Sequence, residues 1–223
     1  MKCLIVTAGE QPEYELLAAH TKDADLVICA DGAADALMAH SIIPDVLIGD
    51  FDSADSASIA FMEASGAALM RLEVDKNETD TEAAVALALE SGAEEIVVLG
   101  ALGRRLDHAL GNLGMLLKAD RANVPCRIID SLHEITAAHG DFELHGSPGQ
   151  TVSILPLGGD ITVTATNLKY PLQKLLLRCD ASRGISNIIL NSPATLHIEG
   201  GTALIIKISG NASHFPQYNR MIH

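Results

Sequence analysis

Two carboxylates one residue apart follow a short apolar run in the sequence PDVLIGDFDS. Asp50 and Asp52 come just after the run at residues 46–48, with Ser53 behind them. In extended chain, residues i and i+2 point to the same side, so we expect the two carboxylates to face together and Phe51 to turn the other way. Carboxylates this close repel each other unless a cation neutralises them, and Mg²⁺ accepts one or two carboxylates with phosphate oxygens and water. The motif therefore predicts a magnesium site, and a polar turn with a serine helix cap is the alternative.

Acids also follow a second predicted strand and begin a predicted helix. VICADGAAD is a strand that ends in Asp31, and DKNETDTEAAV puts Asp80 at a helix start. Thr79 and Glu82 have the spacing of a capping box, which predicts Thr79 as the cap of that helix. A helix start also offers free N–H groups to a phosphate, and capping and phosphate binding do not exclude each other.

The segment GALGRRLDHALGNL joins a strand to a helix through a glycine-punctuated turn. Arg104 and Arg105 stand at the helix start, where stability alone favours acids. Cations there, beside glycines, indicate an anionic ligand, and solvated arginines are the alternative. His108 and Asn112 are four residues apart and are expected to share a flank of the helix. The leucines predict its buried stripe, namely Leu106, Leu110, Leu113 and Leu117.

Strand-like runs alternate with helical stretches over the first 130 residues. This alternation predicts βαβ units, and hence an α/β domain over residues 1–130 with a mostly parallel sheet and helices on both faces. The predicted strands are residues 3–6, 26–29, 46–48, 96–99 and 127–129. The predicted helices are residues 14–20, 33–40, 56–65, 81–91 and 106–121.

The helical pattern disappears after about Ser131. Short apolar runs follow one another, separated by Gly, Pro, Asn and Asp. This pattern predicts an antiparallel all-β sandwich or barrel over residues 131–223. The predicted strands are residues 134–138, 152–155, 161–165, 175–178, 188–190, 195–198 and 204–208.

Composition narrows the class of protein. The chain has 223 residues and a net charge of −14, which argues against a general nucleic-acid binder because such proteins need a basic face. A nucleotide remains compatible with this charge if metal ions bridge the like charges. Four isolated cysteines and the lack of a long apolar segment predict buried reduced thiols, a cytoplasmic location and no membrane span. Neither G-x-x-x-x-G-K-[ST] nor G-x-G-x-x-G occurs, so a bound nucleotide would be held by another design.

An ordered set of motifs resembles the thiamine pyrophosphokinase (thiamine diphosphokinase) family. ADGAAD, PDVLIGDFDS, KNETDTE and GRRLDHALGN occur in the first domain, and TNLKYPL and SRGISN in the second are similar to that family's thiamine-side motifs. The set spans the chain from about Asp31 to Asn187. The resemblance implies an α/β domain that binds ATP and magnesium, a β-sandwich domain that binds thiamine, and a homodimer with thiamine at the subunit interface.

The resemblance also implies roles for single residues. The Mg²⁺ ligands would be Asp50, Asp52 and Asp80, and these acids would form the catalytic set together with Arg105, Asp107 and His108. The other ATP-side residues would be Asp31, Ser53, Lys76, Thr79, Arg104 and Asn112. The thiamine-side residues would be Leu168, Tyr170, Ser186 and Asn187.

Three positions depart from the family pattern. Arg104 and Asn167 each stand where glycine is usual, and Asn77 stands where an acid is usual. Asn167 is a mild change because Asn tolerates left-handed backbone. The other two add a charge and remove a carboxylate, so they bear on details of ATP and metal binding.

The implied reaction is ATP + thiamine → AMP + thiamine diphosphate. The thiamine hydroxyl would attack the β-phosphorus, a step that needs positioning and charge neutralisation more than covalent help. Asp107 and His108 are both candidates for the base that takes the hydroxyl proton. Three rival functions are a pyrophosphokinase acting on a pterin alcohol, a metal-dependent phosphohydrolase and a non-catalytic sensor. The thiamine-side motifs argue against the first two, and the intact acids argue against the third.

Overall fold

A computed structural model describes residues 1–52, 54–73, 78–103 and 105–209. The chain divides into two compact units, Met1–Ser131 and Leu132–His223, and each is described by itself. Ser53, Lys76, Asn77 and Arg104, which the sequence analysis singled out, lie outside the described residues.

The first unit is built on a parallel sheet in the order β6-β5-β1-β2-β3-β4. All five predicted strands are confirmed, and their unbroken apolar runs fit a sheet that is buried on both faces. One edge strand was missed because its short apolar run, Ala-Leu-Met, contains no β-branched residue, and most of the strand is exposed. The strands are β1 (Lys2–Val6), β2 (Leu26–Ala30), β3 (Val46–Gly49), β4 (Ala68–Arg71), β5 (Glu95–Leu99) and β6 (Cys126–Ile129).

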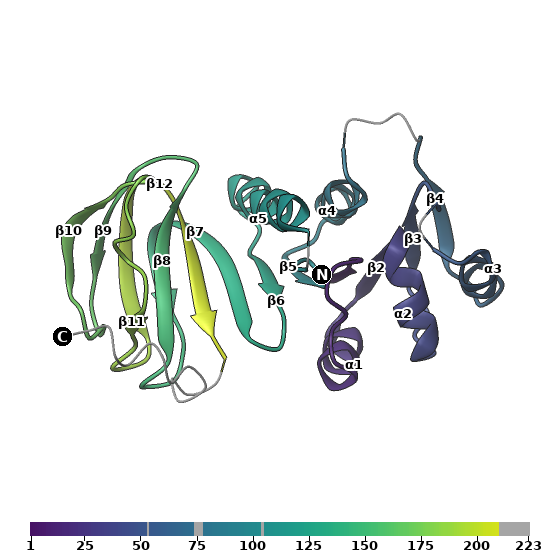
Figure 1. Ribbon diagram of the computed structural model, residues 1–223, viewed down its shortest axis with the longest axis horizontal. Coiled ribbons are helices and arrows are strands. Elements are labelled where there is room, and N and C mark those ends of the chain that lie inside the picture. Colours follow the sequence, from purple (N-terminus) through teal and green to yellow (C-terminus); the bar gives the residue numbers. More distant parts are fainter. Residues whose placement is uncertain (53, 74–77, 104, 210–223) are drawn as a thin grey trace. The chain divides into compact units, whose positions relative to one another are not determined.

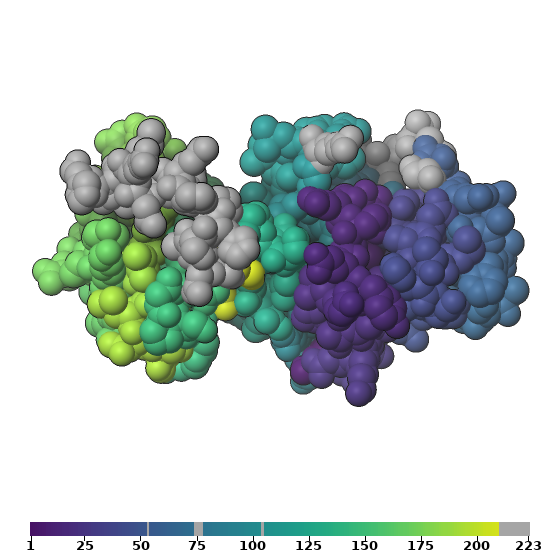
Figure 2. Space-filling model, turned by 60° about the horizontal axis from the view of Figure 1, so that its bottom comes forward, coloured from purple at the N-terminus to yellow at the C-terminus, as the bar shows by residue number. Residues whose placement is uncertain are grey.

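Helices cover both faces of this sheet, as predicted. α4 and α5 lie on one side, and α1 and α2 lie on the other (Figure 1). In the space-filling view, the purple N-terminal residues lie between teal and blue residues, as expected when β1 stands between β5 and β2 (Figure 2). The helices are α1 (Tyr14–Asp23), α2 (Ala34–Ala39), α3 (Ser56–Ala64), α4 (Asp80–Glu90) and α5 (Leu106–Arg121), with a short 3₁₀ turn at Asp31–Ala33. Among the described residues, no helix has the length and hydropathy needed to cross a bilayer.

The predicted buried stripe of α5 is wrong. Leu106 and Leu110 are 70% and 60% exposed, and Leu113 and Leu117 are half-buried. The fully buried positions of the helix are Leu116 and Ala119. The leucine spacing fits a helical stripe, but burial depends on which face of the helix meets other elements, and spacing does not encode that.

The second unit is antiparallel throughout. Its strands run in the order β10-β9-β12-β7, while β8 pairs with the far half of β12 and β11 pairs with β8. One apolar cluster, which includes Val152, Ile154 and Leu196, fills its core. The strands are β7 (His133–Leu144), β8 (Thr151–Leu157), β9 (Ile161–Ala165), β10 (Leu172–Leu177), β11 (Asn187–Ile188) and β12 (Ala194–Ile208).

The two strands expected at residues 195–198 and 204–208 form one strand, β12. Its pairing with β7 shifts register between Ile198 and Ala203, across Gly200 and Gly201. Gly200 has a φ of +85°, which glycine adopts without steric cost. The glycines therefore make a bulge instead of ending the strand, and β12 pairs with β9 on one side of the bulge and with β8 on the other.

The cysteines are all free. Cys3, Cys29 and Cys126 are buried as predicted, and burial raises the pKa of each thiol. Cys179 is exposed, which corrects the expectation for that residue: it follows β10 and its N–H donates to Asp160 at 2.9 Å.

A substitution at Gly184 tests how much its backbone conformation contributes to the stability of the second unit. Its φ is +91°, and a Cβ there would lie 2.1 Å from the carbonyl oxygen of Ile154. We expect Gly184→Ala to lower the free energy of unfolding by about 1–3 kcal/mol, through strain and loss of the bond from Ile154 N–H to Gly184 O. Urea denaturation measures the change. Gly159→Ala is the matched control because a Cβ there meets nothing, and equal effects of the two variants would contradict this account.

Candidate functional site

A pocket of about 730 Å³ opens at the carboxyl ends of the first unit's strands. The strand order changes direction between β1 and β5, and ligands of open α/β sheets collect at such a switch point. The loops after β1, β2, β3 and β5 line the pocket, together with the starts of α4 and α5. The lining residues are 7–10, 30, 32, 50, 79–81, 101, 103, 105, 108, 109 and 112.

Three carboxylates converge beside this pocket. Asp31 follows β2, Asp50 and Asp52 follow β3, and one oxygen from each lies within 4.8 Å of the others. Asp31 is buried, Asp50 is half-buried and Asp52 is exposed. Three clustered carboxylates are hard oxygen donors that suit a divalent cation such as Mg²⁺ or Ca²⁺.

Register explains the position of Asp31. β2 and β3 are neighbours in which Ala30 pairs with Ile48, so Asp31 comes opposite Gly49. A Cβ on Gly49 would lie 2.5 Å from the Cβ of Asp31. Glycine at this position therefore lets the two strand ends approach, and the N–H of Ala54 further fixes the Asp31 carboxylate at 3.2 Å.

Asp50 and Asp52 face together, but not for the reason expected from an extended chain. β3 ends at Gly49, and Phe51 has a φ of +63°. The chain therefore turns at Phe51, and this turn places the carboxylates of Asp50 and Asp52 on the same side. The N–H of Asp52 donates to Asp50 Oδ1 at 3.3 Å within this turn. The Phe51 ring packs against the core, as expected for the residue between the acids, and the Arg71 guanidinium lies 4.8 Å from the ring centre.

A loop that the sequence analysis did not single out forms one wall of the pocket. Residues 7–10, with the sequence TAGE, follow β1, and the N–H groups of Gly9 and Glu10 donate to the carbonyls of Gly100 and Leu102 at 2.8 and 2.5 Å. A Cβ on Gly9 would lie 2.2 Å from the oxygen of Gly100. A glycine three residues past the end of a buried strand was the signal that could have identified this loop.

The start of α4 brings Thr79 and Asp80 to the pocket. The predicted cap is confirmed, since Thr79 Oγ1 accepts the N–H of Glu82 at 3.2 Å. The Glu82 side chain turns instead to Lys118 of α5, with 3.0 Å between the charged atoms. This ion pair ties together α4 and α5, which both contribute residues to the pocket. Asp80 lines the pocket with Asp50 but lies outside the group of three converging acids.

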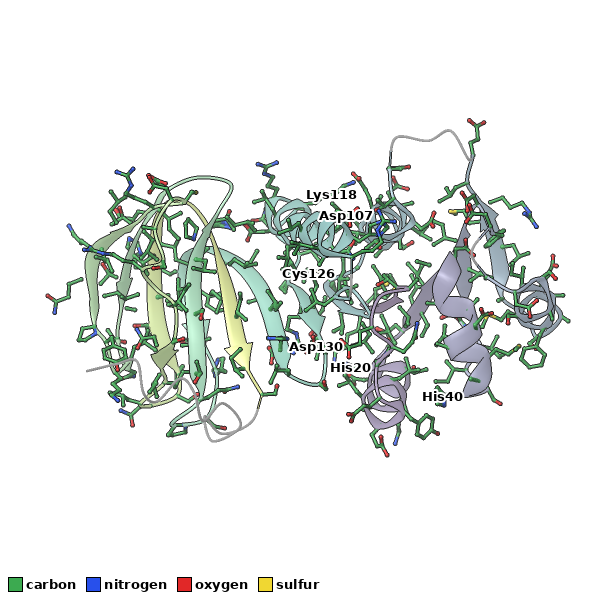
Figure 3. The ribbon with its side chains drawn as sticks, in the orientation of Figure 1. His20, His40, Asp107, Lys118, Cys126 and Asp130 are labelled. Carbon is green, nitrogen blue, oxygen red and sulfur yellow. The ribbon has the colours of Figure 1, made fainter. Side chains whose placement is uncertain are left out.

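The start of α5 brings Arg105, His108 and Asn112 to the pocket. Asn112 Nδ2 donates to the carbonyl of Ala101 at 2.7 Å and so holds the glycine-rich turn against the helix. Asp107 and Lys118 both project from α5 (Figure 3).

Arg105 forms a bidentate ion pair with Asp107. Its Nε and a terminal nitrogen donate to the two carboxylate oxygens at 3.2 and 2.6 Å. This bonding lowers the pKa of Asp107 to about 2 and raises the pKa of Arg105. Asp107 is therefore ionised throughout the physiological range, and both of its oxygens are engaged.

The predicted thiamine-side residues all lie in the second unit. Leu168 and Asn187 are only 4% and 3% exposed, whereas Tyr170 is 40% exposed. Lys169 Nζ lies 5.5 Å from the centre of the Tyr170 ring. Ser186 has a φ of +58°, and its N–H donates to Ser153 Oγ at 3.1 Å.

Two family models match the chain, one for each unit. The model for "Thiamin pyrophosphokinase, catalytic domain" matches residues 17–128, and that for "Thiamin pyrophosphokinase, vitamin B1 binding domain" matches residues 133–202.

The chain belongs to the thiamine pyrophosphokinase family. The thiamine pyrophosphokinase of Bacillus subtilis is 30% identical over 206 residues, which cover 91% of this chain and 96% of that protein. A crystal structure of thiamine pyrophosphokinase from Bacillus subtilis has a TM-score of 0.84 and 28% identity, covering 93% of this chain and 99% of that one. The structure from Candida albicans, at 17% identity, shares the fold with a TM-score of 0.82 over 93% of this chain and 89% of that one. The predicted family and its two-part fold are confirmed.

The Arg105–Asp107 pair can be tested by titration. Because the pKa of Asp107 is lowered, the ion pair is fully formed at any pH above the ordinary carboxylate pKa. It also persists below that pKa and is lost only as the pH falls through about 2. We expect carboxyl ¹³C NMR of the wild type to show Asp107 mostly ionised at pH 3. In Arg105→Gln the pKa should return toward the ordinary value of about 3.9. An identical Asp107 titration in both proteins would refute the pairing.

Proposed function

We propose that the protein transfers the diphosphate group of ATP to the hydroxyl of thiamine, giving thiamine diphosphate and AMP. The observation that carries the proposal is the convergence of acids, a capped helix start and Arg105 around one pocket in a chain of this family. The match of residues 133–202 to a vitamin B1 binding domain supports thiamine as the acceptor. The chemistry breaks the bond between the β-phosphorus and the oxygen that bridges it to the α-phosphate, and forms a bond to the thiamine oxygen.

The metal would be held by Asp50 and Asp52, with Asp31 beside them and Asp80 facing the same pocket. When bound, Mg²⁺ neutralises triphosphate charge and lowers the cost of building negative charge on the departing AMP. Without such neutralisation, an acidic pocket in a chain of net charge −14 would repel ATP. The three converging acids therefore support a nucleotide that enters as its magnesium complex.

The starts of α4 and α5 would bind the phosphates. The start of α4, beside Thr79, is suited to phosphate oxygens because a helix N-terminus directs backbone N–H groups and the positive end of its dipole outward. Arg105 would stabilise the charge on the transferred diphosphate, while Asp107 holds the guanidinium at the helix start. Asn112 would act indirectly, because its amide fixes the turn at Ala101.

His108 is better suited than Asp107 to take the hydroxyl proton. A carboxylate with a pKa of about 2 is a weak base at neutral pH, and both oxygens of Asp107 already accept bonds from Arg105. His108 lines the pocket. We therefore assign the base to His108 and the positioning of Arg105 to Asp107.

The proposal includes a homodimer with thiamine bound at the subunit interface, and a cytoplasmic location. The family resemblance supports the dimer. Four free cysteines support a reducing compartment.

An assay for AMP and thiamine diphosphate with Mg·ATP and thiamine tests the activity, and Asp52→Asn tests the metal assignment. We expect this variant to lose at least about a hundredfold in kcat, because one charge that holds the cation is gone. Its free energy of unfolding without metal should not fall, because Asp52 is exposed and its neutralisation relieves repulsion among three close carboxylates. Glu63→Gln, the same charge change on an exposed part of α3, should keep full activity.

Two results would redirect the proposal. Normal turnover by Asp52→Asn would remove that residue from the metal site. AMP formation with a pterin alcohol but not with thiamine, or phosphate release without any acceptor, would replace the proposed reaction.

A further inference from the structure

Two loops of the second unit pair like short strands. Leu168 forms a β-bridge with Ile189. On either side of the bridge, Lys169 N–H donates to the Ile188 carbonyl at 2.9 Å, and Leu190 N–H donates to the Asn167 carbonyl at 2.8 Å. Leu168 and Ile189 are buried, so this pairing anchors both loops to the core. Tyr170 comes at the end of the paired stretch and is 40% exposed.

The side chain of Asn187 closes this pairing by bonding to the backbone of Tyr170. Asn187 Oδ1 accepts the Tyr170 N–H at 3.0 Å, and Asn187 Nδ2 donates to the Tyr170 carbonyl at 2.7 Å. Oδ1 also accepts the N–H of Ile188 at 2.9 Å. The amide thus binds both backbone polar groups of one residue, as a paired strand would.

These bonds leave Asn187 little capacity to contact a ligand. A side-chain amide has two lone pairs on oxygen and two N–H bonds. Both lone pairs and one N–H are engaged within the chain, and the residue is only 3% exposed. Its contribution to a binding site must therefore pass through what it holds in place, which is Tyr170.

The neighbouring backbone is fixed in a similar way. Ser186 N–H donates to the hydroxyl of the buried Ser153, and the Gly184 carbonyl accepts the Ile154 N–H at 2.8 Å. The segment before Asn187 is thus attached to β8, and Asn187 connects it to Tyr170. A site held rigidly before its ligand arrives avoids the entropy cost of ordering on binding.

We propose that Asn187 is a positioning residue for the acceptor subsite, which fixes Tyr170 so that its ring contacts the aromatic rings of the acceptor. This inference rests on the proposed function for the identity of the acceptor. Tyr170 is the member of this group that is exposed and can offer a ring face. Asn187 acts behind it and touches no substrate.

Initial rates with thiamine and Mg·ATP varied in turn test this role. Asn187→Asp keeps the shape of the side chain but places a carboxylate oxygen where an N–H faced the Tyr170 carbonyl. We expect KM for thiamine to rise about tenfold, with KM for ATP and kcat within about twofold of the wild type. Asn191→Asp makes the same change at an exposed position of this unit and should leave all three parameters within about twofold.

A double-mutant cycle separates positioning from direct contact. If Asn187 acts through Tyr170, adding Asn187→Asp to Tyr170→Ala should raise KM for thiamine by less than about twofold more. Additive effects would mean that Asn187 contacts the acceptor itself, and would overturn the inference. A loss spread equally over kcat and both KM values would reveal a merely structural residue and would also overturn it. Should Asn187→Asp fail to fold, Asn187→Ser replaces it in the same cycle.

Amide hydrogen exchange distinguishes a failure of this inference from a failure of the proposed function. The Tyr170 N–H of the free wild-type protein should be protected, and its protection should be lost in Asn187→Asp but retained in Asn191→Asp. Rapid exchange of this amide in the wild type would overturn the positioning role whatever the enzyme does. A protected amide in a protein that forms no thiamine diphosphate would support the bonding of Asn187 to Tyr170 and would reject the proposed function.

Discussion

Mutual repulsion of carboxylates at the ends of two neighbouring strands is the constraint on which the site depends. At about 4 Å, two unit charges repel by about 1 kcal/mol in water and by about 4 kcal/mol near a protein surface. Asp31, Asp50 and Asp52 are brought this close by β2 and β3, whose register is fixed by a core of apolar side chains. The fold therefore holds these charges together, and the proposed divalent cation would relieve the repulsion.

The approach of the two strand ends requires a backbone without a side chain at Gly49. A Cβ there would lie too close to the Cβ of Asp31, so any other residue would push the loops apart. Gly9 and Gly100 play the same part where the loops after β1 and β5 meet. Glycine at these positions lets the strand-end loops close around one pocket.

The two proposed sites, one in each unit, differ in how their residues are held. In the first, charged side chains line a pocket. The Glu82–Lys118 pair links two of its helices, and Asp107 holds the guanidinium of Arg105 in place. In the second, the buried Asn187 bonds to the backbone of Tyr170, and the buried Ser153 accepts the N–H of Ser186 in the segment that leads to Asn187. Phosphate transfer needs the charges of the first design, whereas an organic ring needs the fixed surface of the second.

Strand and helix periodicity in the sequence determined the parallel sheet, its five helices and the change to antiparallel strands near Ser131, because apolar spacing reports local structure directly. The order of motifs determined the family. The tertiary structure alone decided that Asp31 joins Asp50 and Asp52, because that depends on the register of strands 18 residues apart in the chain. It also decided that residues 7–10 line the pocket, that Leu106 and Leu110 are exposed, and that Asn187 faces inward. Each of these depends on which element lies opposite a residue, and spacing along one segment carries no information about a distant neighbour.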